Sequence, residues 1–395
     1  MKKTFVWLLV ITLVLTSLVP VFAMAEGTGV AKEDLKIGVV HIMDLSDQGY
    51  TFNHDLGAKY MLEALGLDES QYIPKFNIAD QDYAATRDAI QELVEAGCQI
   101  IFTTSFGYGD ATMEMAKEYP EIQFCHATGF YAHGGPENLH NYFAKIHQTR
   151  YLGGIAAGLK AKEIDNPKLG YVAAVPYAEV ISGYTAFFLG AQSVYPEATM
   201  DVIYLGSWGE AQKEKEIAER LINSGCGVIS QHSDSVTPAI AAQDAGAFHV
   251  GYNNDMIPAA PQASLTSARI NWGIYMTYAV QSVIDGTPIS VDWGEGLVAG
   301  AGDAGAAYLS PLNADIVADG TQEAIDAAIT EILDGKMIFS GALVDADGNP
   351  IEIVNFDGDV IFTFDSDEAS FEESAEFSAP AFNPKNHLMG INVIE

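Results

Sequence analysis

Short apolar runs alternate with helix-like segments along most of the chain, and this alternation restricts the possible folds more than any other feature. Strand-like runs in the first half cover residues 35–43, 72–76, 100–103, 123–127 and 139–145. Strand-like runs in the second half cover residues 169–175, 200–205, 227–231, 248–252 and 264–269. Strands that alternate with helices form parallel sheets, so two such series predict two doubly wound α/β lobes.

One predicted strand, residues 100–103, runs into a glycine-punctuated loop and then into a predicted helix. The loop offers hydroxyl, aromatic and carboxylate side chains: Thr104, Ser105, Phe106, Tyr108 and Asp110. Open α/β sheets bind ligands at the carboxyl ends of their strands, so the loop suits a flat small molecule with polar edges. The alternative is an ordinary turn in which Asp110 only caps its helix.

Other predicted strand ends also carry groups that suit a binding site. The candidate aromatic walls are Tyr50, Phe52, Phe106 and Trp208. The candidate acceptors are Asp110, Glu179, Asp234 and Asp255, and the candidate donors or acceptors are His54, Ser105, Asn253 and Asn254. Their common position at carboxyl ends of strands favours one shared site over a set of unrelated caps.

The N-terminus has the pattern of a cleaved signal peptide over residues 1–25. Lys2 and Lys3 precede an apolar run over residues 5–21, and small residues at 23 and 25 fit a cleavage site before Glu26. A membrane anchor is the alternative, but polar residues and a proline interrupt the run. Without a nearby cysteine for lipid attachment, we expect a periplasmic or secreted protein.

Composition and motifs exclude several functions. The net charge is −34, with 19 Lys and Arg against 53 Asp and Glu, and nucleic-acid binding needs basic patches. The chain contains no nucleophile elbow, no phosphate-binding loop and no dinucleotide loop after its first strand, so we expect no enzyme and no cofactor. Cys98, Cys125 and Cys226 lack metal-type spacing, which indicates buried free thiols and no metal site.

The last quarter of the chain departs from the alternation. Residues 321–333 predict a helix, and residues 336–344 and 350–354 predict a hairpin. A polar turn at 355–359 and a short strand at 360–364 follow, before an acidic segment at 365–376. Asp345, Asp347 and Asn349 lack the full pattern of a calcium loop, so an acidic hairpin tip is expected.

Several motifs together resemble the basic-membrane-protein family of solute-binding proteins, the purine-binding branch of ABC importers. They are DQGYTFNH at 47–54, TTSFGYGD at 103–110, HATG at 126–129, GGIAAG at 153–158, GAQSVYP at 190–196, SW at 207–208, QHSDS at 231–235 and LTS at 265–267. The resemblance implies a type I periplasmic-binding-protein fold, with a ligand in the cleft between two lobes. It also implies a membrane permease as partner and a monomeric protein.

The resemblance implies three crossovers between the lobes and therefore approximate boundaries. We expect the first lobe at residues 35–145 plus about 270–291, and the second at 146–269 plus about 292–320. A helix, a hairpin and an acidic tail at 321–395 are expected to pack on the lobes.

The same resemblance bears on whether the ligand is a purine base or a nucleoside. Phe52, Asn53 and Asp110 match positions at which nucleoside binders hold their ligand, which adds Asn53 to the candidates. The Lys that those relatives carry after the LTS strand is absent, and Arg269 lies one position early. One residue of offset on a strand turns a side chain to the opposite face, so a purine base is favoured. A sugar-binding protein of the same fold is an alternative, and a secreted nucleoside hydrolase is a less favoured one.

Overall fold

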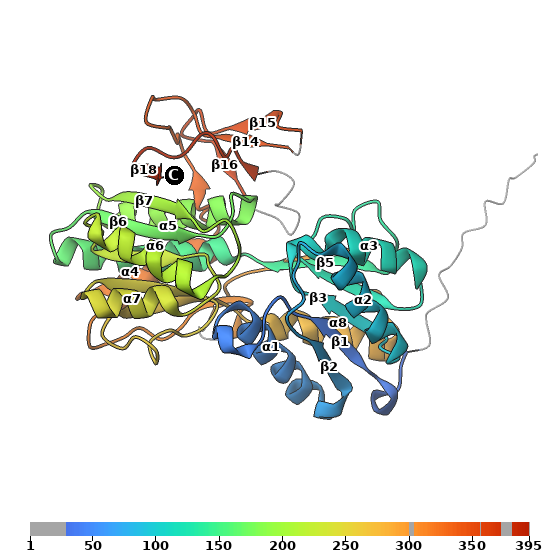
Figure 1. Ribbon diagram of the computed structural model, residues 1–395. Coiled ribbons are helices and arrows are strands. Elements are labelled where there is room, and N and C mark those ends of the chain that lie inside the picture. Colours follow the sequence, from blue (N-terminus) through green and yellow to red (C-terminus); the bar gives the residue numbers. More distant parts are fainter. Residues whose placement is uncertain (1–28, 300–303, 356, 373–380, 395) are drawn as a thin grey trace, which may run out of the picture.

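The computed structural model describes residues 29–299, 304–355, 357–372 and 381–394. The chain forms two α/β lobes, with a small β segment from its C-terminal part beside the second lobe (Figure 1). The expected signal peptide lies outside the described residues, as do residues 373–376 of the acidic segment.

The first lobe is a six-stranded parallel sheet in the order β11-β5-β4-β3-β1-β2. Its strands are β1 (Ile37–Val40), β2 (Tyr72–Lys75), β3 (Ile100–Thr103), β4 (Gln123–Ala127), β5 (Leu139–Ala144) and β11 (Asp292–Glu295). Its helices are α1 (Tyr50–Leu65), α2 (Tyr83–Glu95), α3 (Gly109–Glu118) and α8 (Trp272–Asp285). Ile100 and Phe102 pack with α1 and α8, whereas Ile101 packs with α2 and α3. Successive strand residues point to opposite faces, so a fully apolar strand is buried on both sides.

The second lobe is a seven-stranded sheet in the order β12-β10-β9-β8-β6-β7-β18, in which only the β10–β12 pair is antiparallel. Its strands are β6 (Lys168–Ala173), β7 (Thr199–Tyr204), β8 (Val228–Gln231), β9 (Phe248–Tyr252), β10 (Ser264–Ile270), β12 (Ala307–Leu309) and β18 (Ile391–Ile394). Its helices are α4 (Ile146–Glu163), α5 (Ala178–Val194), α6 (Ala211–Asn223), α7 (Thr237–Ala245) and α9 (Thr321–Leu333). The predicted fold class, two doubly wound lobes, is confirmed.

The chain crosses between the lobes three times. The crossovers follow β5 at Lys145, β10 at Asn271, and β11 on the way to β12. The expected return to the second lobe near residue 292 is wrong, because Asp292–Glu295 pairs in parallel with Asn141–Ala144 of the first lobe. The third crossover therefore begins after Glu295, since β11 first completes the first sheet.

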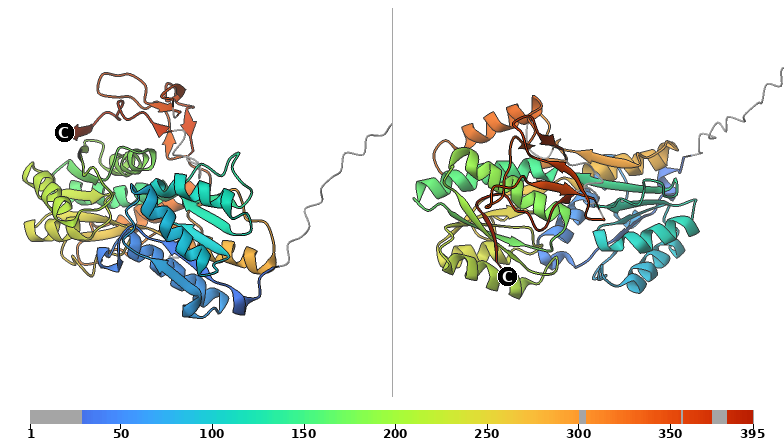
Figure 2. Two further views of the ribbon diagram at one scale, coloured as in Figure 1. Left: turned by 45° about the vertical axis from the view of Figure 1, so that its right-hand side comes forward. Right: turned by 90° about the horizontal axis from the view of Figure 1, so that it is seen from above.

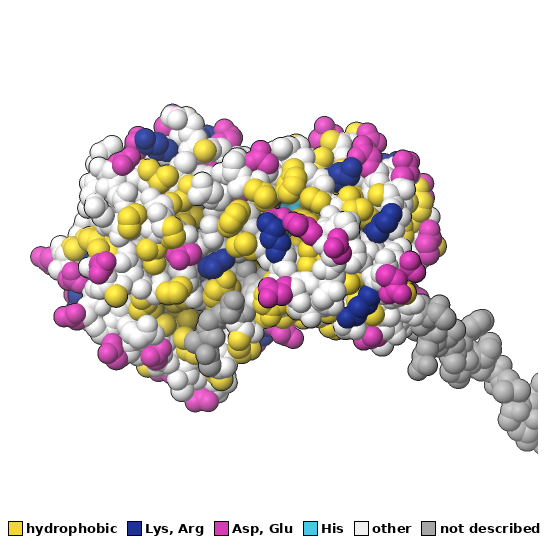
Figure 3. All heavy atoms as spheres, turned by 90° about the horizontal axis from the view of Figure 1, so that it is seen from below, with side chains coloured by type: hydrophobic (Ala, Val, Ile, Leu, Met, Phe, Trp, Pro, Cys, Tyr) yellow, Lys and Arg dark blue, Asp and Glu magenta, His cyan; other side chains and the backbone are white. Residues whose placement is uncertain are grey.

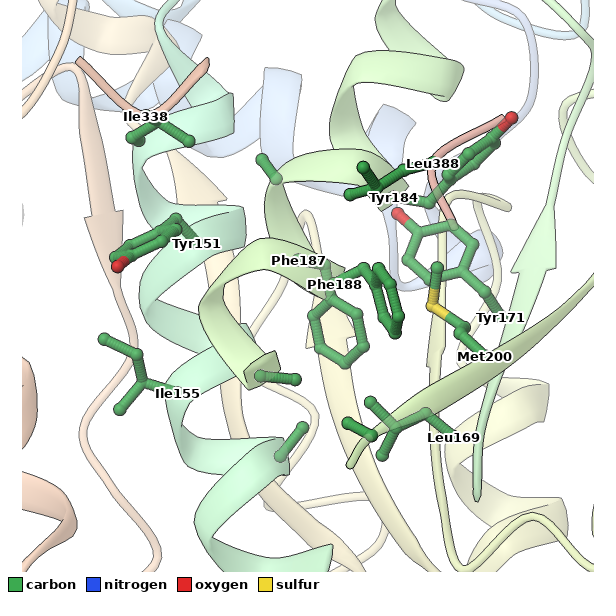
Figure 4. Close-up of a cluster of buried hydrophobic side chains, with 14 of the residues drawn as sticks. Tyr151, Ile155, Leu169, Tyr171, Tyr184, Phe187, Phe188, Met200, Ile338 and Leu388 are labelled. Atoms are coloured by element: carbon green, nitrogen blue, oxygen red, sulfur yellow. The ribbon is translucent and has the colours of Figure 1, made fainter. Parts of the chain in front are cut away.

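The C-terminal part joins the second lobe. Helix α9 packs on α4, and β18 adds a parallel strand beside β7 (Figures 1 and 2). The small strands are β13 (Phe339–Ser340) with β16 (Ser370–Phe371), and β14 (Glu352–Val354) with β15 (Val360–Thr363) and β17 (Ala381–Phe382). Ile338 and Leu388 lie in the same core cluster as Tyr151, Phe187 and Phe188 (Figure 4).

The predicted hairpin around residues 345–349 is only partly formed. A single bridge joins Val344 to Pro350, and the regular ladder forms across the next turn, between β14 and β15. The Asp345 carboxylate accepts hydrogen bonds from the backbone N–H groups of Asp347 and Asn349. This carboxylate stabilises the turn itself, as an acidic hairpin tip would.

Helices α4 and α5 approach so closely that their backbones touch. A Cβ atom at Gly154 would lie 1.9 Å from the carbonyl oxygen of Phe187, and one at Gly190 would lie 2.0 Å from that of Tyr151. These glycines allow the close approach because they carry no side chain. A Cβ atom at the adjacent Gly153 would lie 3.0 Å from a methyl group of Val250, which can shift.

We expect Gly154→Ala to lower the free energy of unfolding by roughly 1–3 kcal/mol, the usual effect of overpacking. Gly153→Ala is the matched control in the same helix, and we expect a loss below about 1 kcal/mol because alanine favours helix formation. Urea unfolding followed by circular dichroism measures both. Equal losses for the two variants would contradict the backbone contact.

Candidate functional site

A pocket lies where the carboxyl ends of the strands of the two lobes face each other. The first lobe contributes Ile42, Tyr50, Ser105, Phe106 and Thr128, and the second contributes Glu179, Trp208, His232, Asp234 and Tyr252. The cavity volume between these residues is about 10 Å³, roughly the space of one water molecule, so the lobes are nearly closed over the pocket.

Six of the candidate site residues line this pocket: Tyr50, Ser105, Phe106, Glu179, Trp208 and Asp234. They come from the segments that follow β1, β3, β6, β7 and β8, and two of them, Tyr50 and Glu179, lie in the first turns of α1 and α5. Parallel strands bring these loops to one edge of each sheet, which is why residues far apart in sequence share one site.

Aromatic rings close the pocket from both lobes. Phe106 belongs to the first lobe, and its ring lies 5.2 Å from the ring of Tyr177 in the second lobe. Tyr177 in turn makes an edge contact with Trp208, with ring centroids 5.9 Å apart. Phe106 and Trp208 therefore offer apolar surfaces from opposite sides.

Asp234 brings a carboxyl group into the pocket. It is 2 % exposed, and within the described residues its carboxyl accepts no hydrogen bond from the protein. Burial raises the pKa of Asp234 well above its usual range, and the nearby carboxyls of Asp47 and Glu214 raise it further. Because an unsatisfied buried carboxyl is unfavourable, this group favours a ligand that donates an N–H or O–H.

A buried cation lies behind the pocket wall. Arg150 of α4 is 1 % exposed, and its guanidinium lies 3.7 Å from the ring centroid of Tyr252. It donates a hydrogen bond to the carbonyl of Gln231, at the end of β8. Burial lowers the pKa of His232 well below its usual range, and the charge of Arg150 lowers it further, so this imidazole is neutral.

The other candidates in the first lobe do not line the pocket. His54 is buried against the ring of Trp272, with centroids 3.9 Å apart. Asn53 donates to the carbonyl of Ile270, Phe52 is partly exposed, and Asp110 is exposed and accepts from the Tyr131 hydroxyl. Helix α3 begins at Gly109, so Asp110 lies in its first turn rather than capping it.

Three candidates of the second lobe, Asn253, Asn254 and Asp255, also lie outside the pocket. Asn254 donates to the carbonyl of Gln48 in the first lobe. Asp255 accepts from the backbone N–H of Ile257 and so stabilises its own turn. Arg269 does not line the pocket either; its guanidinium donates to Asn53 and lies over the ring of Tyr308.

Four pocket residues were not among the candidates: Ile42, Thr128, His232 and Tyr252. Each lies within one residue of the end of a predicted strand, and that position was the available signal. Tyr252 and Ile42 read as core residues because they continue apolar runs. Thr128 and His232 lie in loops whose neighbours were more obvious candidates.

The fold and the pocket define a class. Two α/β lobes joined by three crossovers, with a pocket between facing carboxyl edges, form a type I periplasmic binding protein. Residues 35–332 match the family described as ABC transporter substrate-binding protein PnrA-like, and the chain belongs to this family. Its members are binding proteins of ABC importers rather than enzymes. They lie outside the cytoplasm and act together with a permease in the membrane.

Individual relatives support this assignment. A purine-binding protein of Brucella abortus is 39% identical over 280 residues, 70% of this chain and 77% of that protein. A Haloferax volcanii protein, provisionally named an ABC transporter glucose-binding protein, is 32% identical over 65% of this chain and 62% of its own length. An ABC transporter solute-binding protein from Conexibacter woesei shares the fold, with a TM-score of 0.59, 19% identity, and coverage of 76% of this chain and 97% of that one.

Three further expectations concern the described residues. The three cysteines are buried free thiols there, as predicted. No described group of three or more His, Cys, Asp or Glu side chains is arranged to hold a metal ion. In the described part of the chain, no helix has both the length and the apolar character needed to cross a bilayer.

We expect Asp234→Asn to stabilise the protein at high pH. Because the folded state raises the pKa of Asp234 above its usual 3.8, the stability linked to this group is complete below that value. It is lost as the pH rises through the folded-state pKa. Asparagine mimics the neutral acid, so the melting temperature should rise at pH 8, by roughly 2–4 °C for each kcal/mol in a domain of this size.

The rise in melting temperature caused by Asp234→Asn should become smaller as the pH falls toward 4. Differential scanning calorimetry at a series of pH values measures it. Asp244→Asn, at an exposed position on α7, is the control and should change the melting temperature little at any pH. A gain that is constant across pH would contradict the proposed ionisation.

Proposed function

We propose that this protein binds a purine nucleobase in the pocket between the lobes and delivers it to an ABC importer. The observation that carries the proposal is that Phe106 and Trp208, from opposite lobes, line one small pocket together with the carboxyl-bearing Asp234. A purine has two flat faces for aromatic contact and a rim of N–H donors and ring-nitrogen acceptors. Both features complement these side chains.

The energetics are sufficient for a transport protein. Stacking of one base contributes about 1–3 kcal/mol in nucleic-acid binders. Micromolar affinity needs about 8 kcal/mol. Two aromatic contacts, with two or three hydrogen bonds to groups such as Asp234, Glu179 and Ser105, supply most of this.

Two features favour a base over a nucleoside. Asp110 is exposed outside the pocket and bonded to Tyr131, so it is poorly placed for ribose hydroxyls. Arg269, the nearest substitute for the missing Lys, is bonded to Asn53. The purine-binding relative from Brucella abortus supports a purine ligand.

A sugar is the second candidate. Aromatic faces and carboxylates also bind pyranoses, and the relative from Haloferax volcanii carries a glucose-binding name. The purine is favoured because its relative is more similar and covers more of both chains. The same proposal includes three earlier expectations: the signal peptide is cleaved, the mature protein acts outside the cytoplasm, and it is a monomer.

Titration calorimetry tests the proposal. Protein stripped of bound ligand by unfolding and refolding is titrated with adenine, guanine, hypoxanthine, their nucleosides, and glucose. We expect micromolar or tighter binding of a base, and at least about tenfold weaker binding of its nucleoside, equal to ~1.4 kcal/mol. No heat with any purine would exclude the proposal, and heat with glucose alone would favour the sugar.

Phe106→Ala should weaken binding of the base by roughly tenfold or more, because one stacking contact is lost. The fold should be retained, since Phe106 is only half-buried. Phe371→Ala, which removes the same ring from the C-terminal segment, is the control and should leave the affinity unchanged. Unaltered affinity in a folded Phe106→Ala protein would show that Phe106 supports the loop rather than the ligand.

A further inference from the structure

The carboxyl group of Asp80 joins the two lobes. Asp80 lies in the loop after β2 and is 7 % exposed. Its Oδ2 atom accepts a hydrogen bond from the Ser105 hydroxyl of its own lobe, at 2.7 Å. The same atom accepts from the indole Nε1–H of Trp208 in the second lobe, at 3.0 Å. One oxygen thus links a pocket residue of each lobe.

This contact lies far from the crossovers in both sheets. In the first sheet, β2 is one edge, whereas the crossovers leave from β5 and β11 at the other edge. In the second sheet, Trp208 follows β7, which β6, β8 and β9 separate from the crossover strands β10 and β12. A bond far from a hinge is stretched most when the lobes rotate apart, so it depends strongly on closure.

Other side-chain hydrogen bonds between described residues of the two lobes differ from this one. The bonds of Asn53 with Ile270 and Arg269 lie next to the crossover at Asn271. The bond from Asn254 to the carbonyl of Gln48 is exposed. Hydrogen bonds to carboxylates in buried surroundings are stronger than exposed neutral ones. The bond between Asp80 and Trp208 combines burial with distance from the hinge.

Asp80 does not line the pocket, but it contacts two residues that do, Ser105 and Trp208. A Cβ atom at Gly107 would lie 2.6 Å from the carbonyl oxygen of Asp80, so the loop after β3 is fitted closely against it. Asp80 therefore fixes the indole without competing for the ligand.

We propose that Asp80 is a positioning residue that latches the closed lobes by holding Trp208 over the pocket, and that this latch slows release of the bound base. The proposal rests on the proposed purine-binding function for its ligand. Opening of the lobes breaks the bond between Nε1 of Trp208 and Oδ2 of Asp80. Ser105 stays bonded to Asp80, because both belong to the first lobe.

A double-mutant cycle tests the latch with Asp80→Ala, Trp208→Phe and the double variant. Trp208→Phe keeps an aromatic face but removes the N–H donor. Stopped-flow mixing measures the release rate of adenine, and fluorescence energy transfer between labels on the two lobes measures their separation without ligand. We expect each single variant to release adenine about tenfold faster, in line with the loss of one hydrogen bond to a carboxylate. The double variant should release it no faster than the faster single variant.

Two further variants separate a latch from a general loss of structure. Asp80→Asn keeps an acceptor oxygen of the same shape, so it should restore part of the slow release. Trp293→Phe removes an indole N–H from β11, outside the pocket, and should change neither measurement. Additive effects of Asp80→Ala and Trp208→Phe, or lobes that stay equally close in every variant, would overturn the latch. If no variant binds adenine, the proposed ligand is wrong, and the lobe separation alone then decides for or against the latch.

Discussion

Carboxyl groups buried where the two lobes meet are the constraint on which the binding site depends. A buried carboxylate is unfavourable by several kcal/mol unless hydrogen bonds or opposite charge compensate it. Asp47 accepts from the backbone N–H groups of Gly49, Thr51 and Phe52 at the start of α1. Glu214 accepts from those of Glu210 and Ser235. Asp234 has no comparable donor within the described residues, which is why the proposed ligand is one that donates a hydrogen bond.

The two lobes also touch directly beside Asp234. A Cβ atom at Gly49 would lie 1.5 Å from the carbonyl oxygen of Asp234, so only glycine allows the two backbones to meet there.

The surface of the protein is predominantly acidic, in line with the net charge of −34. On the face in Figure 3, Asp and Glu side chains are spread over both lobes, and the basic side chains lie apart from one another. This distribution agrees with a small-molecule ligand rather than a nucleic acid.

The C-terminal part extends the chain beyond the family match, which ends at residue 332. Ile353 and Phe364 from this part are fully buried in the main core of the second lobe, with α4 and α5. Lys145, at the first crossover, forms an ion pair with Glu372 of the same part. The extension therefore covers apolar surface of the second lobe and reaches the hinge, while the pocket is built by the matched residues.

The sequence by itself determined the elements and their order. Strands 123–127 and 248–252 and the helix at 321–333 have the predicted bounds, because apolar periodicity is a local property that a short window contains. It also determined that polar groups gather at strand ends, and it identified Phe106, Trp208 and Asp234, which line the pocket. Only the tertiary structure decided which strand ends face one another. His54 stacks on Trp272, and Asp80 is bonded to Trp208, through contacts between residues far apart in the chain. The assignment of β11 to the first sheet has the same cause. Pairing with β5 is a long-range choice, and nothing in the local pattern of Asp292–Glu295 encodes it.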